Sequence, residues 1–148
     1  MKFRRQILTI SMFIFAIICT GCVTYYIPVQ SFKDQFQEVD ESTLIKVQVK
    51  DPTGNITEYL ANPIDEIQCI DKKGKPYILK NSPSIEVRFT DMNNKRTIFY
   101  FDRIVLKDTV IIGDISRFLP SKKALSINDI SLIEVQDGHK NFKYINKK

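Results

Sequence analysis

The stretch Ser84-Ile85-Glu86-Val87-Arg88-Phe89-Thr90 (SIEVRFT) sets the expected fold. Apolar side chains at positions 85, 87 and 89 alternate with charged side chains at 86 and 88. Successive side chains of a strand point to opposite faces, so one face would be buried and the other solvated. This alternation is typical of an antiparallel sheet. The segment is therefore expected to be a core strand of a β domain.

Short strand-like runs separated by turn signals lie on both sides of this segment. Turn-forming residues cluster at 51–55, 71–74 and 91–95. Strands are expected at about 44–49, 64–70, 77–79, 97–101 and 142–145, with a tight hairpin over 102–112 and one long strand or two short ones over 124–135. The run at 97–101 is apolar on both faces, so it is expected to lie centrally. This spacing predicts a mainly β fold, a small antiparallel β-barrel or sandwich over residues 42–148.

A short amphipathic helix is expected before the strands. Val29, Phe32, Phe36 and Val39 recur with helical spacing, which predicts a helix from about 32 to 40. Ser31, followed three residues later by an acid, has the form of an amino-terminal cap. We expect the helix to pack on the domain, the alternative being that Phe32 and Phe36 dock on a partner.

The amino-terminal segment has the pattern of a signal. Three basic residues at positions 2, 4 and 5 precede a mostly apolar run at 7–18. That run is shorter than the roughly 20 residues needed to span a bilayer and fits the apolar region of a cleaved signal. Residues 1–21 are therefore expected to be a cleaved signal segment.

The net charge of +5 falls mostly on this signal. Residues 22–148 carry 19 basic and 17 acidic side chains. A near-neutral balance is a weak electrostatic basis for binding a polyanion, so no nucleic-acid partner is expected.

Two cysteines follow the apolar run, in Cys19-Thr20-Gly21-Cys22. This stretch resembles the lipobox of bacterial lipoprotein precursors. The resemblance implies a diacylglyceryl group on Cys22, cleavage just before it, and residues 22–41 as a lipidated tether with the short helix. It also implies a membrane-anchored protein of the cell envelope. Residues 23–25 carry no acidic side chain that would redirect it, so we expect it to face the periplasm.

Metal-binding or catalytic roles for the cysteines and for the single histidine find little support in the sequence. A zinc site needs four ligands, but no second cysteine pair follows and His139 is the single histidine. Cys69 lies in a strand-like run and is expected to be buried and inert. His139 follows a glycine in an expected exposed turn, which does not suit a catalytic base. No catalytic residue, metal site or cofactor is expected.

Four further groups of residues could have a functional role or a purely structural one. The acidic pairs 40–41 and 65–66 are sequence neighbours, so they would point to opposite faces of an extended chain. Residues 91–96 partly match a calcium loop but lack its glycine, which favours a plain turn. Lysines near the end could touch anionic lipids or form a solvated terminus; they are Lys140, Lys143, Lys147 and Lys148. Aromatic residues could line a cavity or fill the core; they are Phe99, Tyr100, Phe101, Phe142 and Tyr144.

The order of strands over residues 84–135 resembles that of small Sm-like barrels, an analogy of fold alone. Two functions remain open. The first is a non-catalytic envelope lipoprotein whose β domain serves protein–protein interaction or assembly with an envelope partner. The alternative is a lipoprotein whose β-barrel binds a lipid or a small apolar ligand.

Overall fold

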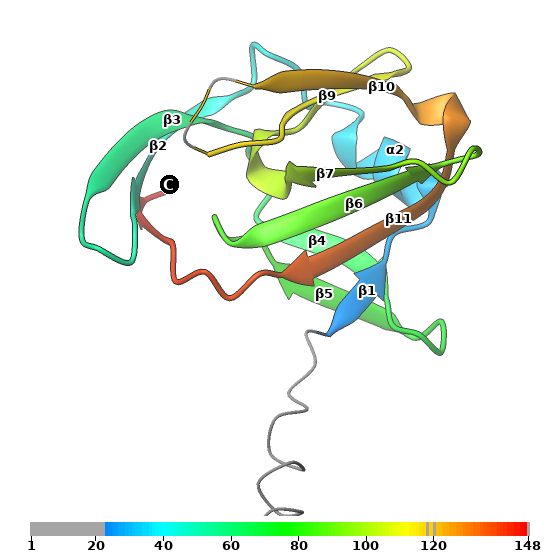
Figure 1. Ribbon diagram of the computed structural model, residues 1–148, viewed down its shortest axis with the longest axis horizontal. Helices are drawn as coiled ribbons and strands as arrows, with labels where there is room; N and C mark the ends of the chain where they lie inside the picture. Colours follow the sequence, from blue (N-terminus) through cyan, green and yellow to red (C-terminus); the bar gives the residue numbers. More distant parts are fainter. Residues whose placement is uncertain (1–22, 118, 120, 148) are drawn as a thin grey trace, which may run out of the picture.

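The computed structural model describes residues 23–117, 119 and 121–147, and this part of the chain is mainly β (Figure 1). Its strands form one six-stranded and two three-stranded antiparallel sheets, accompanied by one short α-helix. The elements are β1 (Thr24–Tyr26), α2 (Val29–Phe36), β2 (Ile45–Lys50), β3 (Ile56–Ala61), β4 (Glu66–Ile70), β5 (Pro76–Lys80), β6 (Ile85–Asp91), β7 (Arg96–Tyr100), η1 (Phe101–Arg103), β8 (Val105–Lys107), β9 (Val110–Asp114), β10 (Lys122–Ser126), η2 (Ile127–Asp129), β11 (Ile130–Asp137) and β12 (Lys143–Asn146). The expected mainly antiparallel β fold with a short helix is confirmed.

The six-stranded sheet has the order β5-β4-β1-β11-β6-β7. β6 contains the alternating stretch, and its apolar residues Ile85, Val87 and Phe89 are at most 1% exposed. On the opposite face, Arg88 lies 3.4 Å from Glu134 of β11. The alternation therefore predicts both the strand and the face that it buries.

β7 is an edge strand of this sheet, although its sequence predicts a central position. Phe99 faces the core and is 1% exposed, whereas Ile98 on the other face is 44% exposed. The ring of Tyr100 on that outer face is covered by the guanidinium of Arg117, at 3.9 Å from the ring centroid. Apolar side chains on both faces of a strand indicate that other groups cover the sheet from above and below. They do not indicate whether the strand is hydrogen-bonded to a neighbour along both of its edges. The prediction of a central strand was therefore wrong.

The strands between residues 85 and 137 circle the core. β6 pairs with β7, η1 leads into β8, β9 pairs with both β8 and β10, and η2 leads into β11, which pairs with β6. Residues 124–135 thus form two strands. The backbone pairing is interrupted at η1 and η2, where each 3₁₀ turn redirects the chain from one sheet to the other. The described strands therefore form no closed barrel, which corrects that alternative.

α2 packs against the six-stranded sheet and fills the core. Phe32 and Phe36 are fully buried and stack with ring centroids 4.3 Å apart. Phe32 meets Phe89 edge-on at 5.3 Å, and Phe36 meets Phe101 at 5.4 Å. The predicted apolar face is confirmed, and it packs on the domain.

The helix begins at Val29 and ends at Phe36, earlier than predicted at both ends. Pro28 precedes it with a φ of −55°, and the Pro28 carbonyl accepts a hydrogen bond from the N–H of Phe32 at 2.9 Å. The fixed φ of proline suits the start of a helix. Ser31 consequently lies inside the helix, where its hydroxyl accepts a hydrogen bond from the Gln35 side chain and caps nothing.

β1 lies inside the six-stranded sheet, between β4 and β11. Tyr25 is opposite Val135 of β11, and Tyr26 is opposite both Glu134 of β11 and Ile70 of β4. The sequence predicts a tether and helix over 22–41 and a β domain at 42–148, with the helix packed on the domain. The described residues of 22–41 contribute a strand to the sheet and a helix to the core of the domain.

The third sheet, β12-β2-β3, covers a small second core made by Val47, Val49 and Ala61. β2 and β12 lie within one residue of their predicted positions. β3 was missed, because its polar residues and its exposed Ile56 and Leu60 give no clean alternation.

Three hairpin turns share one geometry, after β2, β4 and β6. In each, one carboxylate oxygen of an aspartate accepts hydrogen bonds from the backbone N–H groups two and four residues later, at 2.8–2.9 Å. These aspartates are Asp51, Asp71 and Asp91. The residue three positions later has a positive φ in each turn: Gly54 at 95°, Gly74 at 79° and Asn94 at 61°. The predicted turns are confirmed, and the segment at 91–96 forms a plain turn in which backbone N–H groups occupy the Asp91 carboxylate.

Candidate functional site

Cys22, the predicted lipid-attachment residue, lies outside the described residues, which begin at Val23. The first described strand, β1, starts at Thr24. Val23 itself is 61% exposed. The part of the fold nearest to Cys22 in the sequence is therefore the start of β1.

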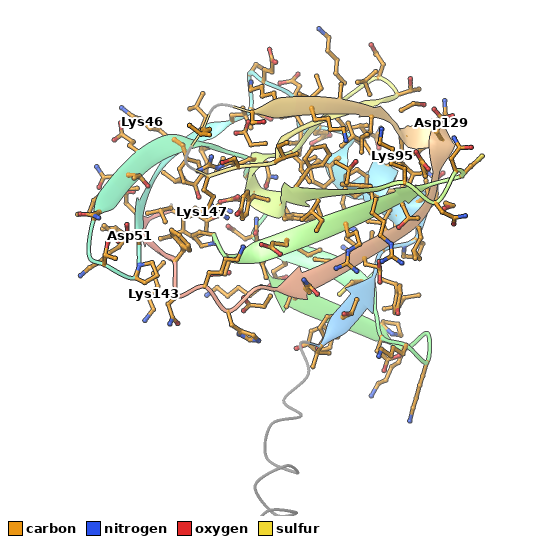
Figure 2. All side chains as sticks on the ribbon, viewed as in Figure 1. Lys46, Asp51, Lys95, Asp129, Lys143 and Lys147 are labelled. Carbon is orange, nitrogen blue, oxygen red and sulfur yellow. The ribbon has the colours of Figure 1, made fainter. Side chains whose placement is uncertain are left out.

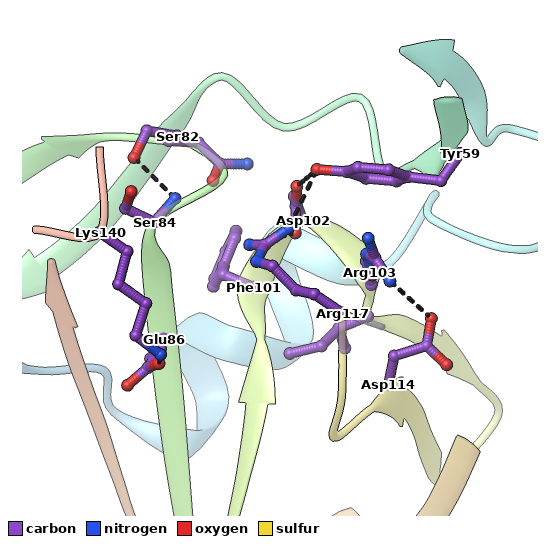
Figure 3. A network of polar contacts seen from close by, with 12 residues as sticks. Tyr59, Ser82, Ser84, Glu86, Phe101, Asp102, Arg103, Asp114, Arg117 and Lys140 are labelled. Carbon is purple, nitrogen blue, oxygen red and sulfur yellow. Dashed lines mark hydrogen bonds and ion pairs between the residues drawn. The ribbon is translucent and has the colours of Figure 1, made fainter. Parts of the chain in front are cut away.

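The most buried charged residue of the described chain is Asp102, in η1, which is 0% exposed. Its carboxylate accepts hydrogen bonds from the hydroxyl groups of Tyr59 and, at 3.0 Å, of Tyr144. Arg117 donates to it at 3.5 Å. The three donors come from β3, β12 and the loop after β9, so distant parts of the sequence meet at this one carboxylate. Figure 3 shows Tyr59 and Arg117 beside Asp102.

Two arginines complete what we call the Asp102 cluster, which consists of Tyr59, Asp102, Arg103, Asp114, Arg117 and Tyr144. The guanidinium of Arg103 lies 3.9 Å from the ring centroid of Tyr59 and forms an ion pair with Asp114 at 3.7 Å. The side chain of Arg117 is only 4% exposed. Besides contacting Asp102, it donates a hydrogen bond to the Tyr59 hydroxyl at 3.2 Å.

Asn62 connects the end of β3 to η1 from the other side. It is fully buried, and its Nδ2 donates hydrogen bonds to the carbonyl oxygens of Phe101 at 2.6 Å and Ile104 at 3.2 Å. Its backbone N–H donates to the carbonyl of Asp102 at 2.7 Å. These hydrogen bonds from Asn62 fix the backbone of η1, which carries the Asp102 side chain.

The electrostatics of the cluster keep its tyrosines protonated. Burial, followed by the nearby charge of Asp102, raises the pKa of Tyr59 well above its ordinary value. The same two causes, in the same order, raise the pKa of Tyr144. A general acid or base works best with a pKa near the working pH. These phenols instead act as hydrogen-bond donors that join the third sheet to the rest of the fold.

An open cleft of about 580 Å³ adjoins the cluster. It is lined by Thr57, Glu58, Tyr59, Arg103, Asp114, Arg117, Leu119 and Lys122. Acids and bases are mixed along its wall, and Arg103 and Asp114 are paired with each other. A second open cleft of about 540 Å³ lies between β5 and the end of the chain, next to Tyr144 and Lys147.

Cys69 lies on β4 and is 4% exposed. Its thiol donates a hydrogen bond to the carbonyl of Tyr77 at 3.4 Å. Burial raises the pKa of this thiol to about 11. Because the thiolate is the nucleophile, Cys69 is a poor one at neutral pH. Its predicted burial is confirmed.

His139 lies in an exposed turn, as predicted, with a φ of 48° and a side chain that is 73% exposed. Its Nδ1 is 3.6 Å from Asp137. Among the acidic pairs, Asp40 accepts hydrogen bonds from the side chain and backbone of Ser42, which lower the pKa of Asp40. Asp65 forms an ion pair with Lys147 at 3.0 Å. These carboxylates are occupied by contacts within the fold.

Two of the four lysines near the end of the chain are paired within the fold. Lys140 forms an ion pair with Glu86, and Lys147, whose side chain is 7% exposed, pairs with Asp65. Lys143 is exposed on β12, and Lys148 lies outside the described residues.

The aromatic residues singled out from the sequence divide between two places. Phe99 and Phe101 are buried in the main core. Phe142 and Tyr144 pack on the second core, and Arg117 lies over the rings of both Tyr100 and Phe142. Sequence reasoning missed the Asp102 cluster, since its members are far apart in the chain and Tyr59 is on the missed strand. A single acid directly after an apolar strand, in Tyr100-Phe101-Asp102, was the available signal.

No helix within the described ranges is long and apolar enough to cross a membrane. In the same part of the chain, no three His, Cys, Asp or Glu side chains are placed to hold a metal ion together. Comparisons of the chain with protein-family models, with curated proteins and with solved structures found no match.

Proposed function

We propose that this protein is a lipoprotein of the cell envelope, anchored through acyl chains on Cys22 and facing the periplasm, whose β domain binds another envelope protein without catalysis. One observation carries the proposal: the first described strand, β1, starts at Thr24, two residues after Cys22, whose modification the lipobox resemblance implies. A mature chain starting at Cys22 would keep all of the described strands and the described core. One acyl chain binds a membrane marginally, whereas two or more give lasting attachment.

The non-catalytic role is supported by how the polar residues are used. The Asp102 carboxylate is shared by three donors, and raised pKa values keep the two phenols protonated. The mixed charges of the adjoining cleft are partly paired. These groups have the features of a structural joint between sheets.

The alternative, a carrier of a lipid or small apolar ligand, is supported less. Such a site needs an enclosed apolar cavity of roughly 300 Å³ or more. Five phenylalanine side chains, each at most 1% exposed, occupy the space between the helix and the sheets; they are Phe32, Phe36, Phe89, Phe99 and Phe101. Their close ring contacts favour a packed core over a carrier.

At a finer level, we propose that residues 84–135 form an open variant of the small barrel that the Sm-like analogy implies. The circuit of strands from β6 to β11 supports this proposal. The analogy concerns architecture and carries no function.

A protein partner is supported by an edge of the third sheet that pairs with no other described strand. β3 is an edge strand, and its outward side chains Ile56 and Leu60 are 60% and 56% exposed. Unpaired strand edges present backbone donors and acceptors to other chains. This edge is therefore the first position at which to look for a partner.

The anchor is tested by intact mass of the protein extracted from membranes. We expect a chain that starts at Cys22 and carries acyl mass, and we expect the Cys22→Ser variant to lose that mass and to leave the membrane fraction. A Cys22→Ser variant that still fractionates with membranes, alongside a wild type without acyl mass, would refute the anchor.

The partner is tested by a photo-crosslinking residue placed at Leu60 in the anchored protein, followed by pull-down from its own envelope. We expect one dominant protein adduct at this position. The same residue placed at the exposed Ile98 of β7 is the control. Equal adduct patterns at both positions would argue against a partner on β3.

A further inference from the structure

The start of β1 lies beside the turn that joins β4 and β5. β1 and β4 are antiparallel neighbours with Tyr26 opposite Ile70, so the start of β1 lies beside the residues that follow Ile70. Tyr25 stacks on Tyr77 of β5, with ring centroids 4.3 Å apart. Figure 1 shows the start of β1 and the turn between β4 and β5 at the same lower end of the molecule. We call residues 71–80, this turn together with β5, the β4–β5 edge.

The β4–β5 edge carries the positive charge of the domain. Its ten residues contain four lysines, Lys72, Lys73, Lys75 and Lys80, and one acid, Asp71. The rest of residues 22–148 contains 15 basic and 16 acidic side chains. The small positive balance of the mature chain is thus concentrated at one edge, next to where the chain begins.

These lysines are available to a partner outside the chain. All four are exposed, and none forms an ion pair with another described residue. Lys46, Lys140 and Lys147, by contrast, each pair with an acid. The Asp71 carboxylate is taken by the backbone N–H groups of Lys73 and Lys75.

Apolar side chains accompany the lysines at this edge. Tyr77 is 45% exposed, Ile78 is 61% exposed, and Val23 at the start of the described chain is 61% exposed. Tyrosine and aliphatic side chains next to lysines are typical of surfaces that lie at the boundary between head groups and water.

We propose that the β4–β5 edge is a membrane-contacting surface whose lysines bind the anionic head groups of the bilayer. The inference rests on the proposed anchor at Cys22. Two residues span at most about 7 Å, so acyl chains on Cys22 would hold the start of β1, and the edge beside it, close to the head groups. The domain would then contact the membrane through this edge, and β3 would face away from the membrane, accessible to its partner. Each lysine near an anionic surface strengthens such contact about five-fold.

The test uses the full acylated protein in vesicles, with an amine-reactive reagent and mass spectrometry to measure the reactivity of each lysine. One set of vesicles contains about a third anionic lipid, and the other is wholly zwitterionic. On the anionic vesicles we expect the four lysines of the edge to react several-fold more slowly. The reference is Lys95, which Figure 2 shows at the upper right, away from the start of β1. Its rate should not change.

A double variant tests whether the lysine charges, and not the shape of the turn, cause the protection. Lys73→Thr with Lys75→Asn gives this turn the residues found at the same positions of the β2–β3 turn, Thr53 and Asn55, which has the same hydrogen bonds. We expect the protection of Lys72 and Lys80 to fall most of the way to its zwitterionic value, because the edge loses two of its four charges. The control, Lys95→Asn with Lys107→Asn, removes two exposed lysines elsewhere and should leave the protection unchanged.

The outcomes distinguish a failure of this inference from a failure of the proposed anchor at Cys22. If the protein carries acyl mass and floats with both kinds of vesicle, but the four lysines react equally on both, the anchor stands and the contact surface is refuted. Protection in native envelopes and not on protein-free vesicles would assign the edge to an acidic protein and would also overturn the inference. A protein without acyl mass refutes the proposed function, whatever the lysine rates show.

Discussion

Asp71 and Lys75 are hydrogen-bonded to each other twice across their turn. The backbone N–H of Asp71 donates to the carbonyl of Lys75 at 2.9 Å, and the backbone N–H of Lys75 donates to Oδ1 of Asp71, also at 2.9 Å. The same Oδ1 accepts the N–H of Lys73 at 2.8 Å. The turn is therefore held by its aspartate, and the lysine side chains remain outside its internal bonding.

The first prediction concerns that aspartate. Asp71→Ala removes an acceptor shared by two backbone N–H groups, and we expect the free energy of unfolding to fall by about 1 kcal/mol. Urea unfolding followed by circular dichroism measures this change. Asp71→Asn retains a side-chain oxygen at the same position and is expected to lose less. A loss from Asp71→Asn as large as that from Asp71→Ala would show that the hydrogen bonds are not the cause.

The second prediction concerns the positive φ of Gly74. No heavy atom lies within 4 Å of the position that a Cβ would take, so a side chain there meets only backbone strain. Left-handed backbone costs about 1–2 kcal/mol for most residues and less for asparagine. We expect Gly74→Ala to lower the free energy of unfolding by about that amount. Gly74→Asn should be nearly neutral, because Asn94 has a φ of 61° at the equivalent position. Equal losses in the two variants would contradict this explanation.

Local sequence signals predicted much of the fold. The alternation at Ile85, Val87 and Phe89 indicated a buried strand face, and the aspartates at 51, 71 and 91 marked the turns. These features depend on neighbours within a few residues, so the sequence displays them directly.

Other features depend on contacts between distant segments. Pairing at the two edges of β7 is decided by other parts of the chain, and nothing in residues 96–100 reveals it. β1 belongs to the sheet because β4 and β11 pair with its three residues, too few for a periodic pattern. The Asp102 cluster combines residues separated by more than 80 positions, from Tyr59 to Tyr144. Sequence patterning cannot identify such a site.

The third prediction tests the Asp102 cluster as a joint. Asp102→Ala leaves the buried guanidinium of Arg117 without its opposite charge, and we expect a loss of about 3–5 kcal/mol in the free energy of unfolding. If that variant does not fold, Asp102→Asn provides a milder form of the same change. Adding Arg117→Met to Asp102→Asn removes the unpaired charge and should restore part of the loss. Additive losses in the double variant would show that the two side chains are not coupled. The surface pair of Lys46 and Glu58 supplies a control, since Glu58→Gln should change stability little.

The fourth prediction follows from the tyrosines of that cluster. Their pKa values are raised in the folded protein above the ordinary value of 10.0, so the folded state holds these protons more tightly than the unfolded state does. Their contribution is fully present below about pH 10 and is lost as the pH rises above it. We expect the urea midpoint to fall between about pH 8 and about pH 10.5. Tyr59→Phe with Tyr144→Phe should make this fall smaller, whereas Tyr26→Phe should not. A fall of equal size in all three proteins would assign the effect to other groups.

The fifth prediction concerns Gly113 of β9, which packs against β7 without a hydrogen-bonded ladder between them. A Cβ at this position would lie 2.9 Å from Cγ of Phe99, closer than packed carbons approach, and 3.2 Å from Cγ1 of Ile104, which is a tight contact. Phe99 is 1% exposed and cannot move aside freely. We therefore expect Gly113→Ala to lower the free energy of unfolding by about 1–3 kcal/mol. Phe99→Leu removes part of the opposing ring, so the double variant should be less destabilised than the sum of the two single variants. Strict additivity in urea unfolding would mean that the strain arises elsewhere, and the contact between β7 and β9 would then not be what limits residue 113 to glycine.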